Sequence, residues 1–301
     1  MKLVVPAETR AGERRVAVVP DLVSKLSGLG LEVIVQAGAG EASGAPDAAY
    51  VAAGASITSD IAGALRDADV VASVRPLNPN VSSTLKKGAV TLSFLAPSTD
   101  GEAIRGLAAA GVTALSFELV PRISRAQSMD ALTSQALCAG YRAALVGAEL
   151  LPKFFPLLMT AAGTVQPANV VVLGAGVAGL QAIATAKRLG ARVSAYDVRP
   201  ASADEVKSMG ATFITLDLEA LDGGGGYAKE MTEDRAARQR ELLTPHISKA
   251  DVVITTAAVP GRRAPLLVTA DMVKTMKAGS VEATFVAKNS KRIACSAVVG
   301  K

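Results

Sequence analysis

The sequence predicts an α/β protein with two doubly wound parallel-sheet domains that are joined by a long helix. Its 301 residues are enough for two domains of ordinary size. Half of the residues are hydrophobic and a fifth are charged, which suffices for a buried core and excludes the disordered and fibrous classes. Short Val/Ile-rich runs alternate with Ala/Leu-rich stretches, a rhythm typical of parallel sheets with helices on both faces.

The alternation first runs through residues 1–128, which we expect to form the first domain. Short apolar runs fit buried strands, and Ala/Leu-rich stretches that end near glycine fit helices. The polar segment 121–128 closes this domain without a regular pattern. Strands are predicted at 3–6, 31–38, 70–74, 88–95 and 112–120, and helices at 21–30, 47–55, 60–69 and 100–111.

A long helix is predicted at 129–151, because its apolar positions recur at helical spacing and no strand interrupts them. The strand–helix alternation then restarts, and residues 152–280 are predicted to form the second domain. Residues 281–301 are an atypical tail. In the second domain, strands are predicted at 169–176, 191–198, 212–218 and 250–257, and helices at 177–190, 203–210, 233–243 and 270–279.

The composition argues against several kinds of site. With His246 as its single histidine, the chain is short of residues for a His-based zinc site, a Ser-His-Asp triad or a His general acid. Cys138 and Cys295 lie far apart and form neither a metal-ligand spacing nor a disulfide framework. Aromatic residues make up 3% of the chain, a poor basis for nucleic-acid binding through stacked bases. We also expect no membrane-spanning helix and no signal peptide.

The segment VVLGAGVAG at 171–179 carries the most specific motif. Gly174, Gly176 and Gly179 form G-x-G-x-x-G after an apolar strand and at the start of a helix. The first glycine permits a tight turn, the second lets the backbone approach a pyrophosphate, and the third lets the helix pack against the strand. The helix N-terminus offers N–H groups to the phosphates. This context predicts a Rossmann-type dinucleotide site; the alternative is a glycine-rich turn without a ligand.

Asp197 ends the next predicted strand, about 20 residues after the glycine turn, where dinucleotide-binding domains place a ribose-binding acid. Its carboxylate would accept hydrogen bonds from the adenosine ribose and repel a 2′-phosphate, which favours NAD over NADP. Arg199 leaves the other choice open, since a nearby arginine can serve a 2′-phosphate.

Two further segments are candidates by position. Thr256, Ala257 and Ala258 follow a strand of the second domain, at the sheet edge where doubly wound proteins bind ligands; an ordinary loop is the alternative. The polar stretch RISRAQSMD before the long helix could hold a carboxamide and phosphates. The alternative there is a solvated loop in which Ser128 is the N-cap of the long helix.

Six segments of the chain carry a family resemblance. They span residues 1 to about 280, and the RISRAQSMD loop is the most specific, since alanine dehydrogenases share much of the rest. Through them the chain resembles the NAD(H)-binding component, domain I, of proton-translocating nicotinamide nucleotide transhydrogenase. In many bacteria this component is the separate alpha-1 subunit. The segments are ETRAGERRVAVVPDLV (8–23), PRISRAQSMDALTSQ (121–135), AGYRA (139–143), LGAGVAGLQAIATAKRLGARVSAYDVRPA (173–201), GGYAKE (225–230) and ADVVITTAAVPGRRAP (250–265).

The resemblance implies a Re/Si-specific NAD(P)+ transhydrogenase reaction. Hydride passes directly between NAD(H), bound here in a cleft between the domains, and NADP(H), bound by a partner domain or beta subunit. A membrane-spanning subunit couples this exchange to proton translocation. Two nicotinamide rings in contact need no acid, base or metal, which agrees with the shortage of histidine. A homodimer is also implied, at the cytoplasmic face of the inner membrane or at the matrix side in an organelle.

The resemblance also implies roles for individual residues. A polar loop near the nicotinamide would include the three residues implied as catalytic, Arg122, Gln127 and Asp130, together with Ile123, Ser124, Arg125, Ser128 and Thr133. The pyrophosphate would lie against Gly174, Gly176, Val177 and Gly179, and the adenosine against Asp197, Val198 and Arg199. Further contacts would come from Gly226 and Tyr227 at the tip of a mobile loop, and from Gln239, Thr256, Ala257 and Ala258. By itself, Gln239 reads equally well as an exposed helix residue.

Alanine dehydrogenase is the second possibility within the superfamily. That enzyme places a Lys and a His in its first domain to hold and protonate the keto acid. The corresponding positions here look like Arg75 and Ala96, and His246 falls in the second domain. The acid of that reaction is therefore missing, and we rank this possibility low.

The chain departs from the family pattern in two places. Leu137 stands where the family usually has Asn, in the helix after the polar loop. The resemblance stops near residue 280, where the family continues with a segment that completes the first domain, and the tail EATFVAKNSKRIACSAVVGK follows instead. We expect a truncated or frame-shifted product, and a natural variant end is the other possibility. For the function, an NAD-binding but inactive module is the corresponding alternative. Much of the net charge of +5 lies in this tail.

Overall fold

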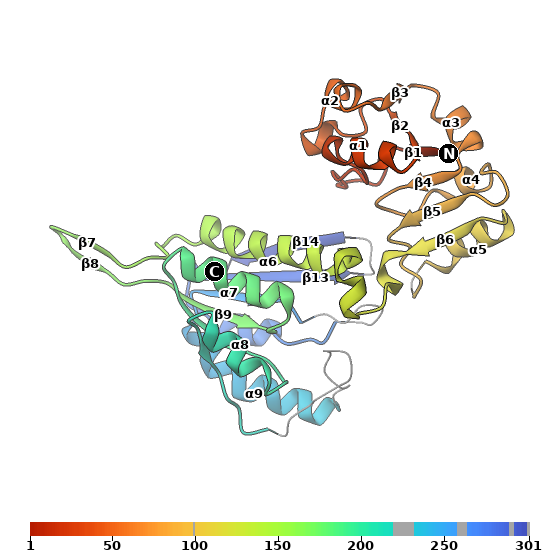
Figure 1. The fold of residues 1–301 in the computed structure, drawn as a ribbon. Coiled ribbons are helices and arrows are strands. Elements are labelled where there is room, and N and C mark those ends of the chain that lie inside the picture. Colours follow the sequence, from red (N-terminus) through yellow and green to blue (C-terminus); the bar gives the residue numbers. More distant parts are fainter. Residues whose placement is uncertain (99, 219–231, 258–263, 289–291, 300–301) are drawn as a thin grey trace. The chain divides into compact units, whose positions relative to one another are not determined.

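The computed structural model confirms an α/β protein with two doubly wound sheets (Figure 1). It describes residues 1–98, 100–218, 232–257, 264–288 and 292–299. The chain divides into two compact units, Met1–Ala131 and Leu132–Lys301, hereafter unit 1 and unit 2.

Unit 1 contains a parallel sheet of six strands in the order β3-β2-β1-β4-β5-β6. The order places β1 beside β4 in the middle, so the chain winds outward in both directions from this point. The strands are β1 Lys2–Val5, β2 Glu32–Gln36, β3 Ser56–Thr58, β4 Val70–Ala72, β5 Val90–Ser93 and β6 Thr113–Ser116. The helices are α1 Pro20–Gly28, η1 Glu41–Ser43, α2 Asp47–Ala52, α3 Ile61–Asp67, α4 Pro79–Ser82, α5 Gly101–Ala109, η2 Phe117–Leu119 and η3 Ser124–Met129.

Alternate residues of the central strand of unit 1 enter separate cores on its two faces. Leu3 and Val5 pack in one apolar cluster with Tyr50 of α2, whereas Val4 packs in another with Leu65 of α3. Residues on a strand point alternately to opposite faces, so a run such as LVV is buried on both sides. The continuous apolar strands of the sequence thus follow from a sheet that is covered twice.

Unit 2 repeats this strand order as β11-β10-β9-β12-β13-β14, with β14 antiparallel to β13. The parallel strands β9 and β12 pair in the middle, with Val170 opposite Val252. The strands of this sheet are β9 Asn169–Leu173, β10 Arg192–Tyr196, β11 Thr212–Phe213, β12 Val252–Thr255, β13 Val281–Lys288 and β14 Arg292–Val299. The helices are α6 Ala131–Leu150, α7 Val177–Arg188, α8 Ser202–Ser208, α9 Glu233–Lys249 and α10 Ala270–Lys274.

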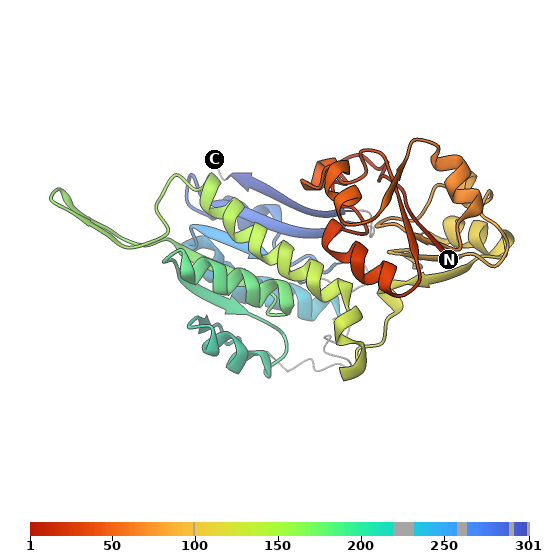
Figure 2. The ribbon, with the colours of Figure 1, turned by 45° about the horizontal axis from the view of Figure 1, so that its top comes forward.

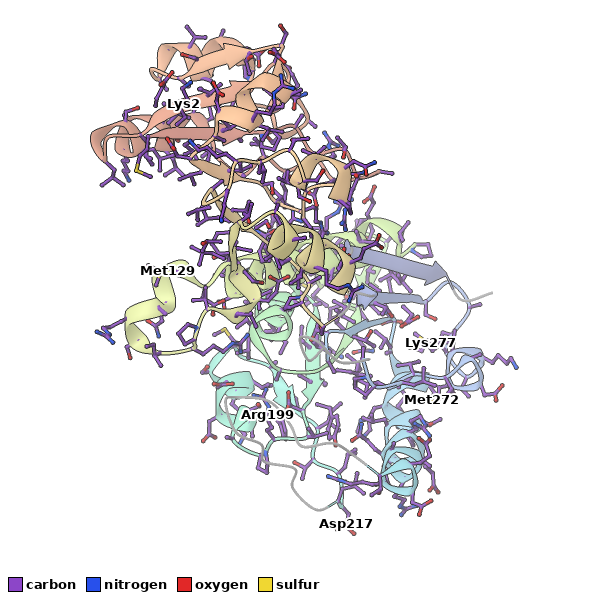
Figure 3. All side chains as sticks on the ribbon, turned by 90° about the vertical axis from the view of Figure 1, so that its right-hand side faces the viewer. Lys2, Met129, Arg199, Asp217, Met272 and Lys277 are labelled. Carbon is purple, nitrogen blue, oxygen red and sulfur yellow. The ribbon has the colours of Figure 1, made fainter. Side chains whose placement is uncertain are left out.

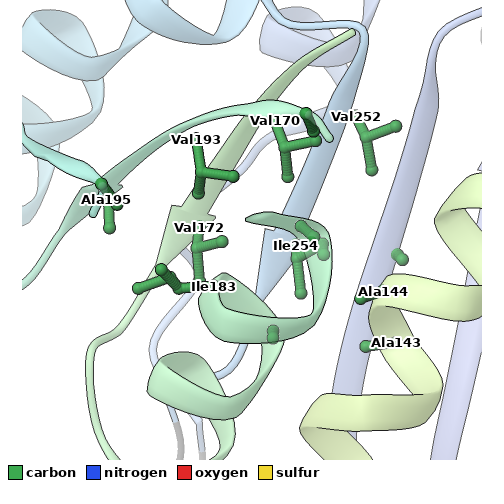
Figure 4. Packing of buried hydrophobic residues seen from close by; sticks show 14 of the residues in the cluster. Ala143, Ala144, Val170, Val172, Ile183, Val193, Ala195, Val252 and Ile254 are labelled. Atoms are coloured by element: carbon green, nitrogen blue, oxygen red, sulfur yellow. The ribbon is translucent and has the colours of Figure 1, made fainter. Parts of the chain in front are cut away.

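The sheet of unit 2 also separates two cores. Val170 and Val172 of β9 face α6 and α7, and Figure 4 shows the valine, isoleucine and alanine side chains that meet there. Val171 and Leu173 face the opposite side, where they join buried residues of α9 and α10. The α6 side uses many alanines, which let helix and sheet backbones approach closely.

The long helix α6 lies beside α7 (Figure 2). A Cβ atom added to Gly140 would stand 2.0 Å from the carbonyl oxygen of Ala178, so only glycine permits this approach. The helix begins at Ala131, and Ser128 lies inside the preceding 3-10 turn η3. The interpretation of Ser128 as the residue that caps the long helix is therefore wrong.

Most of the predicted strands are longer than the observed ones, and two of them differ most. The strand predicted at 112–120 becomes β6, which ends at Ser116 and turns into η2. The carboxylate of Glu118 holds this turn in place by accepting hydrogen bonds from Ser116 Oγ at 2.6 Å and from the Ala96 N–H at 3.0 Å. The strand predicted at 212–218 pairs only over β11, at the sheet edge where one neighbour is missing.

Unit 2 also contains a β-hairpin that the sequence pattern does not predict. Strands β7 Leu158–Thr160 and β8 Gly163–Val165 pair antiparallel, and Figure 1 shows this arm extending away from the rest of unit 2. Met159 on the arm is 80% exposed.

Within the described parts of the chain, no helix combines the length and the apolar character needed to cross a membrane.

Gly140→Ala should destabilise unit 2 by about 1–3 kcal/mol, because the new methyl group collides with backbone that cannot move aside. Urea unfolding followed by circular dichroism measures the change. Gly28→Ala is the matched control: it is also helical, and its Cβ would meet nothing within 4 Å. Equal stability of the two variants would contradict the close contact between α6 and α7.

Candidate functional site

The candidate site lies at the carboxyl edge of the unit 2 sheet, where β9 and β12 are neighbours and the chain winds away in opposite directions. Connections that leave in opposite directions open a crevice at this edge, which is where doubly wound proteins bind ligands. The glycine turn after β9 and the loop after β12 both begin here. The topology therefore brings two segments together that lie about 80 residues apart in the sequence.

The three glycines of the turn have three different environments. Gly174 has a φ angle of +100°, and a Cβ there would stand 2.9 Å from the Ala257 nitrogen. At Gly179 a Cβ would stand 1.8 Å from the Gly174 carbonyl oxygen, so α7 packs directly onto the turn. At Gly176, by contrast, a Cβ would meet nothing within 4 Å. The first and third glycines are thus required by the fold, whereas the open space at the second can admit a ligand.

Helix α7 begins at this open space. Its N-cap residue is Gly176, which has no side chain to accept hydrogen bonds from the N–H groups of the first turn. A helix N-terminus of this kind favours an anion, because the N–H groups and the helix dipole both present positive charge. The turn and the helix together therefore fit a phosphate or pyrophosphate group.

Asp197 follows β10 and binds back to the glycine turn. Its Oδ2 accepts a hydrogen bond of 2.7 Å from the Ala175 N–H. Arg199 binds the same carboxylate through its N–H, its Nε and its Nη2 at 2.9, 2.9 and 3.0 Å. Burial alone would raise the pKa of Asp197, but the Arg199 guanidinium and the two backbone N–H groups outweigh it and hold this pKa below its usual range.

Thr256 ties the loop after β12 to the glycine turn. Its hydroxyl donates to the carbonyl oxygen of Gly174 at 2.9 Å and is buried. Ala257 follows directly and approaches Gly174. The turn is therefore held from both neighbouring strands, by Asp197 on one side and by Thr256 on the other.

Gln239 is 1% exposed, so its interpretation as an exposed helix residue is wrong. Its Oε1 accepts a hydrogen bond of 3.1 Å from the hydroxyl of Tyr196, the residue before Asp197. Burial raises the pKa of Tyr196 to about 12, so the phenol stays protonated as a donor at ordinary pH. Sequence reasoning missed Tyr196; its position beside the acid at the end of a buried strand was the available signal.

The other predicted residues fall into three groups. Val177 opens α7, and Val198 lies between Asp197 and Arg199 in unit 2. The polar loop belongs to unit 1 and is built around η3. Arg122 and Ile123 precede η3, and Asp130 follows it; the residues within it are Ser124, Arg125, Gln127 and Ser128. Thr133 lies in α6. Gly226, Tyr227 and Ala258 lie outside the described residues. Leu137, at the position where Asn was expected, is 42% exposed on α6.

Unit 1 has the same strand order, but an ion cluster fills the corresponding edge between β1 and β4. Glu13 follows β1 and binds the guanidinium groups of Arg15 at 2.7 Å and Arg75 at 3.0 Å. Glu8 accepts hydrogen bonds from the backbone N–H groups of Val74 and Arg75 at 2.6 and 3.3 Å. Burial alone would raise the pKa of Glu13, but the two arginines lower it from 4.5 to about 2.

The positions compared with alanine dehydrogenase lie at this edge of unit 1. The side chain of Arg75 is 9% exposed and is bound to Glu13. Ala96 adopts a φ of +52° in the loop after β5, where the Glu118 carboxylate accepts a hydrogen bond from its N–H. Neither side chain supplies an acid, so the described residues of this edge do not assemble the proton donor of a keto-acid reduction.

The strand order, the glycine turn and the acid after β10 define a two-domain α/β protein of the Rossmann-like class. The chain belongs to the alanine dehydrogenase/PNT family. The N-terminal domain of that family matches residues 4–139, and its C-terminal domain matches residues 143–283.

Relatives in this family include transhydrogenase subunits and alanine dehydrogenases. An NAD(P) transhydrogenase alpha subunit of Rhodospirillum rubrum is 51% identical over 289 residues, which cover 93% of this chain and 75% of that protein. The crystal structure of transhydrogenase from Sinorhizobium meliloti is similar with a TM-score of 0.82 and 45% identity, covering 93% of this chain and 76% of that one. An L-alanine dehydrogenase structure is similar with a TM-score of 0.76 and 28% identity, covering 95% and 74%.

Glu13→Gln should destabilise the protein at pH 7 by about 1–3 kcal/mol, because the buried Arg75 and the partly exposed Arg15 both lose a charged acceptor. Since folding lowers the pKa of Glu13, its ionised form stabilises the wild type above pH 4.5, and this contribution disappears as the pH falls toward 2. The difference between wild type and variant should therefore shrink between pH 5 and pH 3. Urea unfolding across this range measures it.

The control for this prediction is Glu102→Gln on the exposed side of α5, which should change stability by less than about 0.5 kcal/mol. A Glu13→Gln penalty that is the same at pH 7 and pH 3 would show that the charge of Glu13 contributes nothing.

Proposed function

We propose that the chain is the NAD(H)-binding component of a proton-translocating NAD(P) transhydrogenase. The observation that carries this proposal is the glycine turn, where Gly174 and Gly179 are required by close contacts and Gly176 faces open space. This is the arrangement that a dinucleotide pyrophosphate needs. The relatedness to transhydrogenase alpha subunits supports the choice of reaction.

The residues of unit 2 bind and orient the nucleotide in this proposal. The first-turn N–H groups of α7 hold the pyrophosphate beside Gly176. Asp197 accepts the hydroxyls of the adenosine ribose, and its negative charge disfavours a 2′-phosphate. Bound NADH supplies the hydride, and NADP+ on the partner accepts it. The chain therefore contributes binding and orientation, and it needs no proton donor or metal for this reaction.

The roles of the polar loop rest on the family resemblance. Arg122, Gln127 and Asp130 are proposed to lie near the nicotinamide. Gly226, Tyr227 and Ala258 are proposed, on the basis of the same resemblance, as further contacts to the nucleotide.

The assembly is also a proposal. The partners are an NADP(H)-binding domain or beta subunit and a membrane-spanning subunit that couples the exchange to proton movement. The protein would then lie at the cytoplasmic face of the inner membrane, or at the matrix side in an organelle. A homodimer is proposed as well, and this proposal rests on the family resemblance.

An NAD-binding module without exchange activity is the alternative. An alanine dehydrogenase activity is disfavoured, since Glu13 already binds Arg75 and Ala96 supplies no acid.

The wild-type chain, mixed with an NADP(H)-binding transhydrogenase component, should transfer hydride from NADH to an NADP+ analogue, and absorbance of the reduced analogue measures the rate.

Gly176→Ala should weaken NADH binding by about tenfold or more, because the methyl group enters the space left for the pyrophosphate. Its melting temperature should stay close to the wild-type value, as no protein atom lies within 4 Å of the added carbon.

Three outcomes separate the possibilities. NADH binding without exchange, with any intact partner, supports the inactive module. Turnover of pyruvate and ammonia with NADH would instead establish an amino-acid dehydrogenase. If wild type and Gly176→Ala bind NADH equally well, the glycine turn is not the binding site.

Asp197→Ala should weaken NADH binding by about tenfold and reduce the discrimination against NADPH, because it removes the acceptor for the ribose and the charge that repels a 2′-phosphate. Titration of both nucleotides by fluorescence measures the two affinities. The matched control is Asp204→Ala on α8, whose side chain is 95% exposed. Unchanged affinity and selectivity in Asp197→Ala would show that this acid does not bind the ribose.

A further inference from the structure

The carboxylate of Asp197 is already saturated with hydrogen-bond donors. Oδ1 accepts from the N–H and the Nε of Arg199, both at 2.9 Å. Oδ2 accepts from the Ala175 N–H at 2.7 Å and from Nη2 of Arg199 at 3.0 Å. A carboxylate offers about four lone-pair positions, and these four donors use them. Two ribose hydroxyls can therefore donate to Asp197 only if two of the present donors leave.

The four donors differ in how easily they can leave. The Ala175 N–H belongs to the glycine turn, which Thr256 and the close approach of Gly179 hold in place. The Arg199 N–H belongs to backbone that continues directly from β10. The guanidinium, by contrast, lies at the end of a flexible side chain that is 20% exposed. Arg199 is labelled in Figure 3. Its rotation away from Asp197 needs no change in the backbone, and its departure frees one position on each oxygen.

We propose that Arg199 is a specificity-determining residue that competes with the adenosine ribose for Asp197. In the free protein the guanidinium occupies the two positions that the ribose hydroxyls take, and it leaves them when NAD(H) binds. This inference rests on the proposed function and deepens it. Asp197 has a lowered pKa and stays ionised at neutral pH, so the competing ion pair persists under ordinary conditions.

The displaced guanidinium changes selectivity as well as affinity. It remains attached two residues from the acid, within reach of the 2′ position of the ribose that Asp197 holds. A guanidinium there can bind a 2′-phosphate, which Asp197 alone repels. Arg199 therefore weakens NAD(H) binding and also narrows the preference for NAD(H) over NADP(H).

The opposite role makes the opposite prediction. If Arg199 were simply a contact to the adenosine, its removal would weaken NADH binding. Under competition, its removal spares the nucleotide the step of breaking the ion pair, and binding becomes tighter. The sign of the change in NADH affinity therefore distinguishes the two roles.

The test uses Arg199→Met, which keeps a long apolar stem and removes the guanidinium. Titrating the full chain with NADH and with NADPH by fluorescence, at one fixed salt concentration, gives the dissociation constants. NADH should bind about three- to tenfold tighter to the variant than to wild type, and NADPH should not bind tighter. Arg199→Lys should lie between the two, because an ammonium group cannot bind both carboxylate oxygens in the same fork geometry.

Arg192→Met is the matched control, since Arg192 is exposed at the start of β10, at the opposite end of this strand from Asp197, and contacts Gln166. It should leave both dissociation constants unchanged. Melting temperatures establish that each variant is folded, and Arg199→Lys carries the test if Arg199→Met is not.

If wild type binds NADH saturably and the folded Arg199 variant binds it more weakly or equally well, the competition is overturned while the proposed function stands. Absence of saturable NADH binding by wild type overturns the proposed function, and the competition with it.

Discussion

The contact between Gly179 and the carbonyl oxygen of Gly174 is the constraint on which the candidate site depends. No side chain fits there, since a Cβ at residue 179 would stand 1.8 Å from that oxygen. Helix α7 can therefore start directly above the end of β9. Two neighbours then hold the same turn, Asp197 through the Ala175 N–H and Thr256 through the Gly174 carbonyl. Strands β10, β9 and β12 thus fix one short piece of backbone, which holds the helix N-terminus in place at the carboxyl edge of the sheet before any ligand binds.

The two sheets show that strand order alone does not make a binding site. Both units have the same order, with a pair of parallel strands in the middle, and doubly wound sheets bind ligands at the carboxyl edge of such a pair. In unit 2 the first strand leads into GAGVAG and leaves open space beside Gly176. In unit 1 it leads into PAETRAGERR, whose acids bind the backbone and the guanidinium of Arg75. The difference in function arises from these loops rather than from the fold.

The sequence was sufficient for the parts of the fold that repeat a simple pattern. Buried strands such as β9 are apolar on both faces, so their existence and order along the chain were predictable. The strand ends were not predictable, because β6 stops where the Glu118 carboxylate accepts a hydrogen bond from the Ala96 N–H, a group in the loop after another strand. The hairpin of β7 and β8 was missed for another reason: its segments LMT and GTV lack the Val-rich run that marks β4, which is also a strand of three residues.

Some residues of the candidate site were likewise predictable from the sequence, and others were not. The glycine turn and Asp197 were predictable because backbone geometry demands glycine and because the acid follows a strand at a fixed spacing. Gln239 was not, since a glutamine in a charged helix normally faces water; only the fold reveals that α9 presents it, with Leu243 and Ile247, to the sheet. The spacing of Arg199 and Asp197 is compatible with an ion pair. It does not reveal that all the acceptor positions of the Asp197 carboxylate are occupied. Whether an acid is available to a ligand depends on how many donors it already binds, and that number is a property of the folded chain.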